Sequence, residues 1–145
     1  MGLMKILNVF NNKAVNALII KDGKLLVVKR REKEIPWPGM YVMPGGRIEK
    51  GESKKEAVIR EVKEETGEDV RVNRYIGTRK FYWRYIPFTV SFYTAEIIGG
   101  RTRPLKKEVA KIKWLSLDEF LDNLKEHKFP MRGIDKLVDI VKPYF

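Results

Sequence analysis

The segment from Ser53 to Gly67 constrains the fold more than any other part of the sequence, because helix signals stand at both of its ends. Glu56 follows Ser53 by three residues, which is the pattern of a capping box, where each side chain accepts a hydrogen bond from the other residue's backbone N–H. Gly67 stands where a glycine in the left-handed conformation commonly ends a helix. The pattern predicts a helix from Lys54 to Thr66.

Negative charge is concentrated in and just before this helix, although the whole chain has a formal net charge of +11. Six glutamates fall between Glu49 and Glu65, and Glu52 lies in the segment that leads into the helix. Glu61, Glu64 and Glu65 share one face, because they are spaced i, i+3 and i+4. Several carboxylate oxygens on a rigid element suit a hard cation such as Mg²⁺ or Mn²⁺.

The same helix face has a simpler interpretation, which is a solvated surface of glutamate and lysine. Like charges at these spacings destabilise an isolated helix by roughly 0.2–0.5 kcal/mol per pair, and Arg60 and Lys63 offset only part of that repulsion. Val58, Ile59 and Val62 occupy the neighbouring arc, so we expect them to face a core. Helical spacing alone leaves both interpretations open.

Glycines before the helix favour a ligand site. Gly45 and Gly46 let the backbone approach a ligand closely, and Gly51 gives a second tight point. A helix N-terminus favours phosphate, and a pI near 9.8 suggests anionic partners such as nucleotides or nucleic acid. A basic surface that only keeps the protein in solution is the alternative.

The rest of the chain predicts an α/β fold with helices packed on a mixed sheet. Asp22-Gly23 marks a hairpin turn, Pro87 marks a bend in a strand-forming region, and Gly99-Gly100 marks another turn. With 145 residues and no flexible linker, we expect a single domain over residues 1–145. The predicted strands cover residues 14–20, 25–30, 41–43, 69–78, 80–98 and 112–115, and two further helices cover residues 117–124 and 134–141.

The sequence contains no cysteine, so a metal must bind oxygen ligands or the one histidine, His127. We expect His127 to be an exposed residue at a helix end. No apolar run approaches the roughly 20 residues that span a bilayer, and the N-terminus does not match a secretory signal. We therefore expect a cytoplasmic protein with no membrane partner.

One spacing resembles a known family: Gly46, five residues, Glu52, seven residues, and then Arg60-Glu61-Val62-Lys63-Glu64-Glu65-Thr66-Gly67. This resembles the Nudix box of the Nudix hydrolases, which are MutT-like enzymes, and every fixed position matches in type and spacing. Glu68 departs from the pattern, which usually has an aliphatic residue there. The stretches 37–46 and 108–120 are also similar to the family's lead-in strand and to its late glutamate, strand and closing helix.

The resemblance implies an α/β/α sandwich around a mixed β-sheet. It also implies Mg²⁺- or Mn²⁺-dependent hydrolysis of the pyrophosphate bond in a nucleoside diphosphate linked to another moiety. On this resemblance, Glu61 and Glu65 are expected to be the principal metal ligands, and Glu64 a further ligand or the base that activates water. Arg60 is expected to orient Glu61 or its neighbour through a salt bridge, and Glu52 to support the metal shell.

Three more positions follow from the same resemblance and from the glycine pattern. The Gly45 carbonyl is expected to face the metal, and Gly45 and Gly46 together are candidates for close contact with the substrate. Glu108 is similar to a late glutamate that serves some family members as a ligand or base. A surface residue without a catalytic role is the alternative for Glu108.

Contacts that choose the substrate are expected outside the box. Arg30, Arg31 and Arg84 are candidate phosphate contacts, and Tyr82 is a candidate for stacking on a base. Aromatic side chains that only fill a core are the alternative for the tyrosine. Further candidates of the same kinds are Arg79, Lys80, Trp37, Tyr41, Trp83 and Tyr85.

Three functions stay open at this point. The first is hydrolysis of a small nucleotide, such as a nucleoside triphosphate, ADP-ribose or a dinucleoside polyphosphate. The second is the same chemistry at RNA 5′ ends, which the positive charge suggests, although a nucleotide is the favoured partner. The third is a non-catalytic ligand-binding regulator, against which the complete set of Arg60, Glu61, Glu64 and Glu65 argues. A homodimer is compatible with all three.

Overall fold

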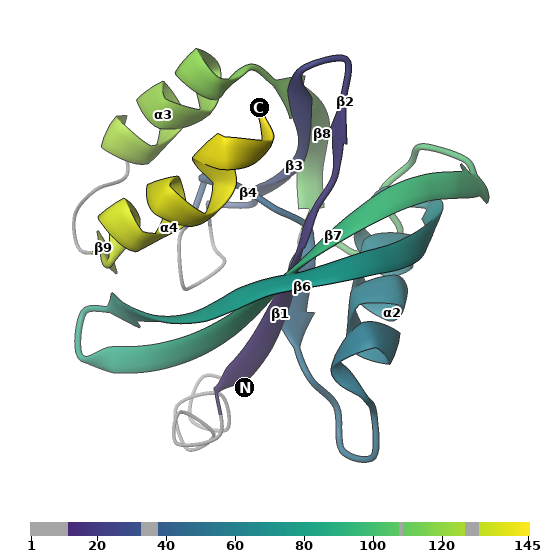
Figure 1. The fold of residues 1–145 in the computed structure, drawn as a ribbon, viewed down its shortest axis with the longest axis horizontal. Coiled ribbons are helices and arrows are strands. Elements are labelled where there is room, and N and C mark those ends of the chain that lie inside the picture. Colours follow the sequence, from purple (N-terminus) through teal and green to yellow (C-terminus); the bar gives the residue numbers. More distant parts are fainter. Residues whose placement is uncertain (1–11, 33–37, 108, 127–130) are drawn as a thin grey trace.

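A computed structural model describes residues 12–32, 38–107, 109–126 and 131–145 of the chain (Figure 1). It contains both strands and helices, as the sequence predicts. In chain order they are β1 (Lys13–Leu18), β2 (Ile20–Lys21), β3 (Lys24–Arg30), β4 (Tyr41–Val42), β5 (Gly45–Arg47), α2 (Lys54–Thr66), β6 (Glu68–Trp83), β7 (Ile86–Gly100), β8 (Val109–Leu115), α3 (Leu117–Glu126), β9 (Met131–Arg132), α4 (Ile134–Val141) and the 3-10 helix η2 (Lys142–Tyr144).

The strands form two sheets. The five-stranded sheet has the order β5-β1-β7-β6-β9, in which β1 and β7 run parallel and the other pairs are antiparallel, so the sheet is mixed. The second sheet is built on β3, which pairs with β2, β4 and β8. In Figure 1, α2 lies on one side of the strands, and α3 and α4 lie on the other. The expected layering of helices around a mixed sheet is confirmed.

The predicted strand over residues 14–20 is divided between the two sheets. Its first part is β1, and its last part is β2, with Ile19 between them. The carbonyl of Ile19 accepts a hydrogen bond of 2.9 Å from the N–H of Leu26, so the backbone stays paired through the break. The sequence of this stretch is apolar apart from Asn16, so it gives no sign of the crossing.

The long hairpin of β6 and β7 differs from the prediction at both ends. The chain reverses at Arg84 and Tyr85, before Pro87, and Arg84 has a φ of 54° in that turn. Gly99 and Gly100 are not a turn but the end of β7, paired with Asp69 and Glu68. A Cβ on Gly100 would lie 2.5 Å from the carbonyl oxygen of Gly67, so glycine is needed for close pairing there.

Helix α2 has the predicted bounds and the predicted caps. The Ser53 side chain and the Glu56 side chain exchange hydrogen bonds with each other's backbone N–H, and Gly67 ends the helix with a φ of 78°. Val58 and Val62 are buried in a core with residues of β1 and β7. The expectation that Ile59 faces this core is wrong: its exposed fraction is 44%.

Ile59 is exposed because the buried stripe of α2 is centred on another arc. The stripe runs along Ala57, Val58, Glu61, Val62, Glu65 and Thr66. Two of the carboxylates therefore lie on the packed side of the helix and not on its solvated side. No helix among the described residues is long and apolar enough to cross a bilayer.

Candidate active site

Helix α2 presents its carboxylates at different depths. Glu61 and Glu65 are 4% and 7% exposed, respectively, because they lie in the stripe that packs against the sheet. The side chain of Glu64 is 38% exposed, and that of Glu52, before the helix, is 12% exposed. Buried carboxylates are costly unless hydrogen bonds or cations compensate them. The partners of these four side chains therefore determine what the site can do.

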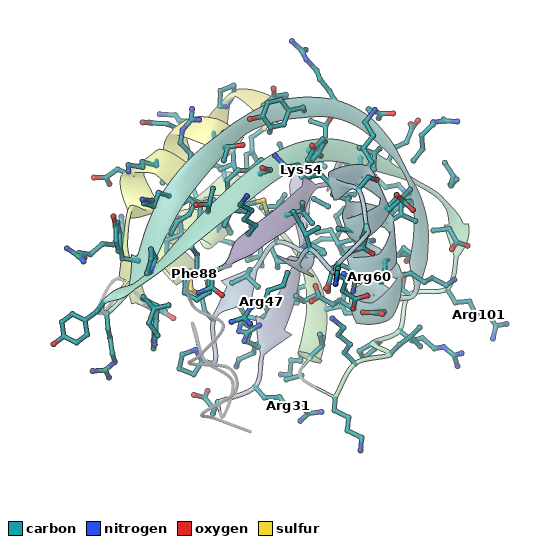
Figure 2. The ribbon with its side chains drawn as sticks, turned by 90° about the horizontal axis from the view of Figure 1, so that it is seen from below. Arg31, Arg47, Lys54, Arg60, Phe88 and Arg101 are labelled. Carbon is teal, nitrogen blue, oxygen red and sulfur yellow. The ribbon has the colours of Figure 1, made fainter. Side chains whose placement is uncertain are left out.

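Arg60 joins three of these carboxylates from within the same helix. Its Nε and Nη2 donate to the two carboxylate oxygens of Glu52, at 2.6 and 2.9 Å. Its Nη1 donates to Glu61 at 2.9 Å and to Glu64 at 3.2 Å. Nη2 also donates to the backbone carbonyl oxygen of Arg47, at 3.1 Å. Figure 2 shows Arg60 beside a group of carboxylate oxygens.

The planar guanidinium suits this task, because its fork of donors can hold several acceptors in fixed directions. Glu52 gains most from it: the Arg60 hydrogen bond holds the pKa of that carboxyl below its ordinary value, against the opposing effect of burial. The carboxylates in turn raise the pKa of Arg60 further above its ordinary value, chiefly through the hydrogen bond with Glu52. The expected orienting contact from Arg60 to Glu61 is present in the structure.

A second cation reaches the same carboxylates from a distant part of the chain. The Nζ atom of Lys106 lies 2.7 Å from an oxygen of Glu61 and 3.0 Å from an oxygen of Glu64. Burial lowers the pKa of Lys106, but its hydrogen bonds with Glu61 and Glu64 outweigh that effect, so its pKa is raised. No sequence motif singles out this residue. Its only signal in the sequence is the basic run over residues 101–107, which does not indicate which cation faces α2.

Backbone hydrogen bonds hold the segment that carries Lys106, which we call the 101–107 loop. The N–H groups of Arg101, Arg103 and Leu105 donate to carbonyl oxygens of Gly67, Thr66 and Glu64, at 3.1, 2.8 and 3.0 Å, respectively. These acceptors belong to the end of α2, whose last carbonyls have no partner within the helix. At the other end of the loop, the Arg31 side chain donates to the carbonyl oxygen of Lys107.

Glu65 lies deepest, beneath the strand that precedes α2. Its Oε1 accepts a hydrogen bond of 2.9 Å from the backbone N–H of Gly45. Burial raises the pKa of Glu65 to about 8, the charge of Glu61 adds to the rise, and the Gly45 hydrogen bond opposes it. A group with that pKa holds a proton through much of the neutral range when no further cation is near.

The two glycines before α2 belong to strand β5 (Gly45–Arg47), which the sequence does not predict. β5 pairs with β1, and Gly46 stands opposite Val15. A Cβ on Gly45 would lie 2.0 Å from the carbonyl oxygen of Val15, and a Cβ on Gly46 would lie 2.6 Å from an oxygen of Glu61. Glycine is therefore needed at Gly45 for pairing with β1, and a side chain at position 46 would displace the Glu61 carboxylate.

Of the predicted phosphate contacts, Arg30 and Arg31 lie near the carboxylates of α2. Arg30 ends β3 and is near enough to Glu65 that its charge counteracts part of the rise in the pKa of that carboxyl. Arg31 holds the 101–107 loop through the carbonyl of Lys107. Glu108, the predicted late glutamate, lies outside the described residues, as does His127.

Tyr82 and Arg84 lie elsewhere, at the turn of the β6–β7 hairpin, at the opposite end of β6 from α2 (Figure 1). The guanidinium of Arg132 stands over the ring of Tyr82, 4.7 Å from its centroid, and donates to the carbonyl oxygen of Arg84 at 3.3 Å. The structure does not bring these two residues together with the carboxylates of α2. Their role in binding a substrate stays a prediction.

The carboxylates fit a hard divalent cation in charge and chemistry. All the candidate ligand atoms are carboxylate oxygens, and two of the side chains that carry them, Glu61 and Glu65, are nearly buried. The ammonium of Lys106 is already bound as a cation to Glu61 and Glu64. In the described part of the chain, no three acidic or histidine side chains converge closely enough to hold an ion as they stand. The protein's own cations occupy the carboxylate oxygens in this arrangement.

Residues 11–137 match the family described as the NUDIX domain. The chain belongs to the Nudix family. The family resemblance and the α/β fold expected from it are thus confirmed. A protein of Methanocaldococcus jannaschii named ADP-ribose pyrophosphatase is 45% identical over 64 residues, which cover 44% of this chain and 37% of that protein. A protein of Pseudomonas aeruginosa named NAD-capped RNA hydrolase NudC is 36% identical over 101 residues, which cover 70% of this chain and 35% of that protein.

Solved Nudix structures share the fold. A NUDIX hydrolase from Nitrosomonas europaea superposes with a TM-score of 0.74 at 24% identity, covering 92% of this chain and 87% of that one. An ADP-ribose pyrophosphatase from Streptococcus suis gives a TM-score of 0.60 at 23% identity, covering 83% and 94%. The chain spans 37% and 35% of the lengths of these two curated relatives.

Proposed function

We propose that this chain is a divalent-metal-dependent pyrophosphohydrolase that cleaves a nucleoside diphosphate linked to another moiety. One observation carries the proposal: Arg60 holds Glu52, Glu61 and Glu64 in one hydrogen-bonded group, on a helix whose Glu65 is buried just behind them. A helix that merely displayed charge to solvent would not bury two of its carboxylates. A binding protein without turnover would need no such arrangement of orienting contacts.

The residues divide the work according to their depth. Glu61 and Glu65 would hold Mg²⁺ or Mn²⁺, with Glu64 as a further ligand and Glu52 as a support. When bound, the ion supplies neutralisation of charge on the pyrophosphate oxygens and activation of water for attack on phosphorus. Arg60 keeps the carboxylates oriented before the substrate binds, so the site does not have to reorganise at the moment of attack. Glu64 is the most exposed of the three helix carboxylates, so it is also the candidate to accept a proton from the attacking water.

ADP-ribose and related dinucleotides are the first substrate class to test. The relative at 45% identity is named an ADP-ribose pyrophosphatase, and a structure with that name shares the fold. Such a substrate carries a pyrophosphate between two organic groups, which is the bond that the proposed reaction breaks. Arg30 lies beside the carboxylates, so it is a candidate to contact the anionic group.

RNA with a nucleotide cap is the second candidate, because two observations favour it. Relatives at 36% identity are named NAD-capped RNA hydrolases, and the chain carries 30 basic residues against 19 acidic ones. A basic surface binds a polyanion more tightly than a mononucleotide, and salt weakens that binding steeply. Equal affinity for a mononucleotide and for an RNA of ten or so nucleotides would exclude this candidate.

The test is product release from a nucleotide panel, with Mg²⁺, with Mn²⁺ and with chelator. The panel holds nucleoside triphosphates, ADP-ribose, dinucleoside polyphosphates and RNAs with a triphosphate or NAD at the 5′ end. We expect metal-dependent release from one class, and a loss of about 100-fold or more in Glu64→Gln. Glu49→Gln is the matched control, because the Glu49 side chain is two-thirds exposed and its distance to Arg60, 3.6 Å, is longer than those of Glu52, Glu61 and Glu64.

Two results would contradict the proposal. Release that persists in chelator would exclude the metal-dependent reaction. Full activity of both glutamine variants would exclude the role given to Glu64. Binding of a nucleotide without release of any product would instead support the non-catalytic regulator.

A further inference from the structure

We propose that Lys106 is a built-in counter-ion of the α2 carboxylates, that a divalent cation must displace it, and that it therefore sets how much metal the site requires. The inference rests on the proposed function, since it assumes that the carboxylates bind a metal. Lys106 is not one of the residues of the Nudix motif. It comes instead from the segment that joins β7 to β8.

The ammonium occupies the oxygens that a metal would need. One Glu61 oxygen is bonded to Arg60 at 2.9 Å, and the other is bonded to Lys106 at 2.7 Å. One and the same oxygen of Glu64 lies 3.2 Å from Arg60 and 3.0 Å from Lys106. A metal that binds the Glu61 oxygen that Arg60 leaves free must therefore take the place of Lys106.

Lys106 is held there by its backbone and not only by its side chain. The residue just before it, Leu105, is bonded to the carbonyl oxygen of Glu64, and the residue just after it is held by Arg31. The helix that carries the carboxylates is thus the same element that positions the loop. The ammonium and the carboxylates are placed relative to each other by a few short contacts.

Displacement has a direction because of the depths of the partners. The side chain of Lys106 is 28% exposed, whereas that of Glu61 is 5% exposed. The long, flexible stem of a lysine can move its ammonium toward water while its backbone stays in place. Glu61 has no such freedom, since it lies in the packed stripe of α2. The cation leaves and the carboxylate stays.

A permanent structural ion pair is the alternative, and it makes the opposite prediction. If Lys106 served only to order the carboxylates, its loss would disorder Glu61 and weaken metal binding. If Lys106 competes with the metal, its loss removes the competitor, and a positive charge no longer opposes the incoming cation. The two cases differ in the sign of the change in metal affinity.

The decisive experiment measures Mn²⁺ binding to the full chain by electron paramagnetic resonance, without any nucleotide. The variants are Lys106→Met, Lys106→Arg and the matched control Lys107→Met, whose side chain is exposed on the neighbouring position. We expect Lys106→Met to bind Mn²⁺ about tenfold or more tightly than the parent chain. Lys107→Met is expected to bind like the parent chain, and Lys106→Arg no more tightly than it.

Thermal unfolding gives a second readout that does not depend on activity. In chelator, Lys106→Met is expected to melt at a lower temperature than the parent chain, because Glu61 and Glu64 lose a cation. In saturating Mg²⁺ that deficit is expected to disappear, because the metal replaces the lost charge. A variant that fails to fold would be recognised here, and Lys106→Gln would then take its place.

The outcomes separate this inference from the proposed function. If the parent chain binds Mn²⁺ but Lys106→Met binds it equally or more weakly, the displacement is excluded and the metal-dependent function stands. If neither chain binds Mn²⁺ at millimolar concentration, the metal-dependent function falls, and the inference falls with it. Tighter binding in Lys107→Met as well would show a general effect of surface charge and would also exclude the inference.

Discussion

The two cations at the acidic face of α2 reach it by different routes. Arg60 lies on the helix itself, and all its carboxylate partners fall between Glu49 and Glu64. Lys106 lies 45 residues beyond Glu61 in the chain and depends on backbone contacts between a loop and the helix end. The first cation is part of a local motif, and the second is a product of the fold.

This difference separates what is permanent in the site from what can change. Arg60 binds through several donors at once, so removing one contact leaves the others in place. Lys106 binds as a single flexible ammonium at the rim. We therefore expect Arg60 to stay in the metal-loaded protein as an orienting group, whereas Lys106 exchanges.

The largest effect on stability is expected from Glu65. Burial and the charge of Glu61 raise its pKa by more than the nearby cations lower it. Its pKa is about 8 in the folded chain and 4.5 ordinarily, so the folded state binds the proton more tightly. The contribution of Glu65 to the free energy of unfolding of the metal-free protein is then greatest below pH 4.5 and is lost as the pH rises to about 8. The fall attributable to Glu65 is roughly 3–5 kcal/mol.

Urea unfolding in chelator at several pH values between 4.5 and 8.5 measures that slope. Glu65→Gln is the comparison, because a neutral amide can still accept the hydrogen bond from Gly45. Curves of stability against pH that run parallel in the two proteins would show that Glu65 has an ordinary pKa.

The next largest effect is expected for Arg60→Ala, which removes the local cation. Glu52 and the buried Glu61 would each lose a charged partner, and we expect the free energy of unfolding to fall by about 3 kcal/mol. Arg60→Lys keeps the charge but not the fork of donors, so it should recover only part of the loss. Denaturant unfolding checks this, and a loss below about 1 kcal/mol would show that Lys106 can substitute for Arg60.

A smaller effect is expected for Leu105→Pro, which tests the distant cation through its backbone. Proline removes the N–H that donates to Glu64, so the free energy of unfolding should fall by about 1 kcal/mol. Lys106 keeps its charge but loses its anchor, so Mn²⁺ affinity should rise, though less than in Lys106→Met. Leu105→Ala keeps the N–H and is the control, and equal Mn²⁺ affinity in both variants would contradict the anchoring role.

The smallest effect on the site is expected for Ser53→Ala, which removes a helix cap and no cation and should therefore change stability alone. The N–H of Glu56 loses its acceptor, at a cost of about 1 kcal/mol. Ser116→Ala removes the corresponding cap of α3, far along the chain from the carboxylates, and should cost a similar amount. Neither variant should change Mn²⁺ affinity in calorimetric titration. A change in Ser53→Ala alone would show that the cap also positions Glu52.

The local half of the site could be predicted from sequence because its contacts are local. The capping residues and the carboxylates lie within one short segment, where helix geometry fixes which of them share a face. The contact from Arg60 to Glu61 was expected from the family resemblance. The bounds of α2 were predicted from its end signals, and those of α4 from its amphipathic pattern. Ile59 shows the limit: the apolar arc was placed correctly at Val58 and Val62, but not the edge of that arc.

The remaining half depends on contacts that no local pattern carries. Gly45 and Gly46 carry no strand pattern of their own, and they become a strand only because they pair with β1. Gly99 and Gly100 look like a turn until Glu68 and Asp69 pair with them. The role of Lys106 follows only from the end of α2, because several basic residues in the same loop have equivalent local sequence. Long-range pairing decides each of these cases.

The 101–107 loop is also one of the connections between the two sheets, because it leaves β7 in the mixed sheet and leads toward β8, which pairs with β3. Near its start, Arg101 and Arg103 are bonded to the end of α2, and at its finish Lys107 is bonded to Arg31, which follows β3. A shift of one sheet against the other therefore changes the distance from the ammonium to the glutamates. The loop therefore links the position of the Lys106 ammonium, and with it the local charge at Glu61 and Glu64, to the spacing of the two sheets that it joins.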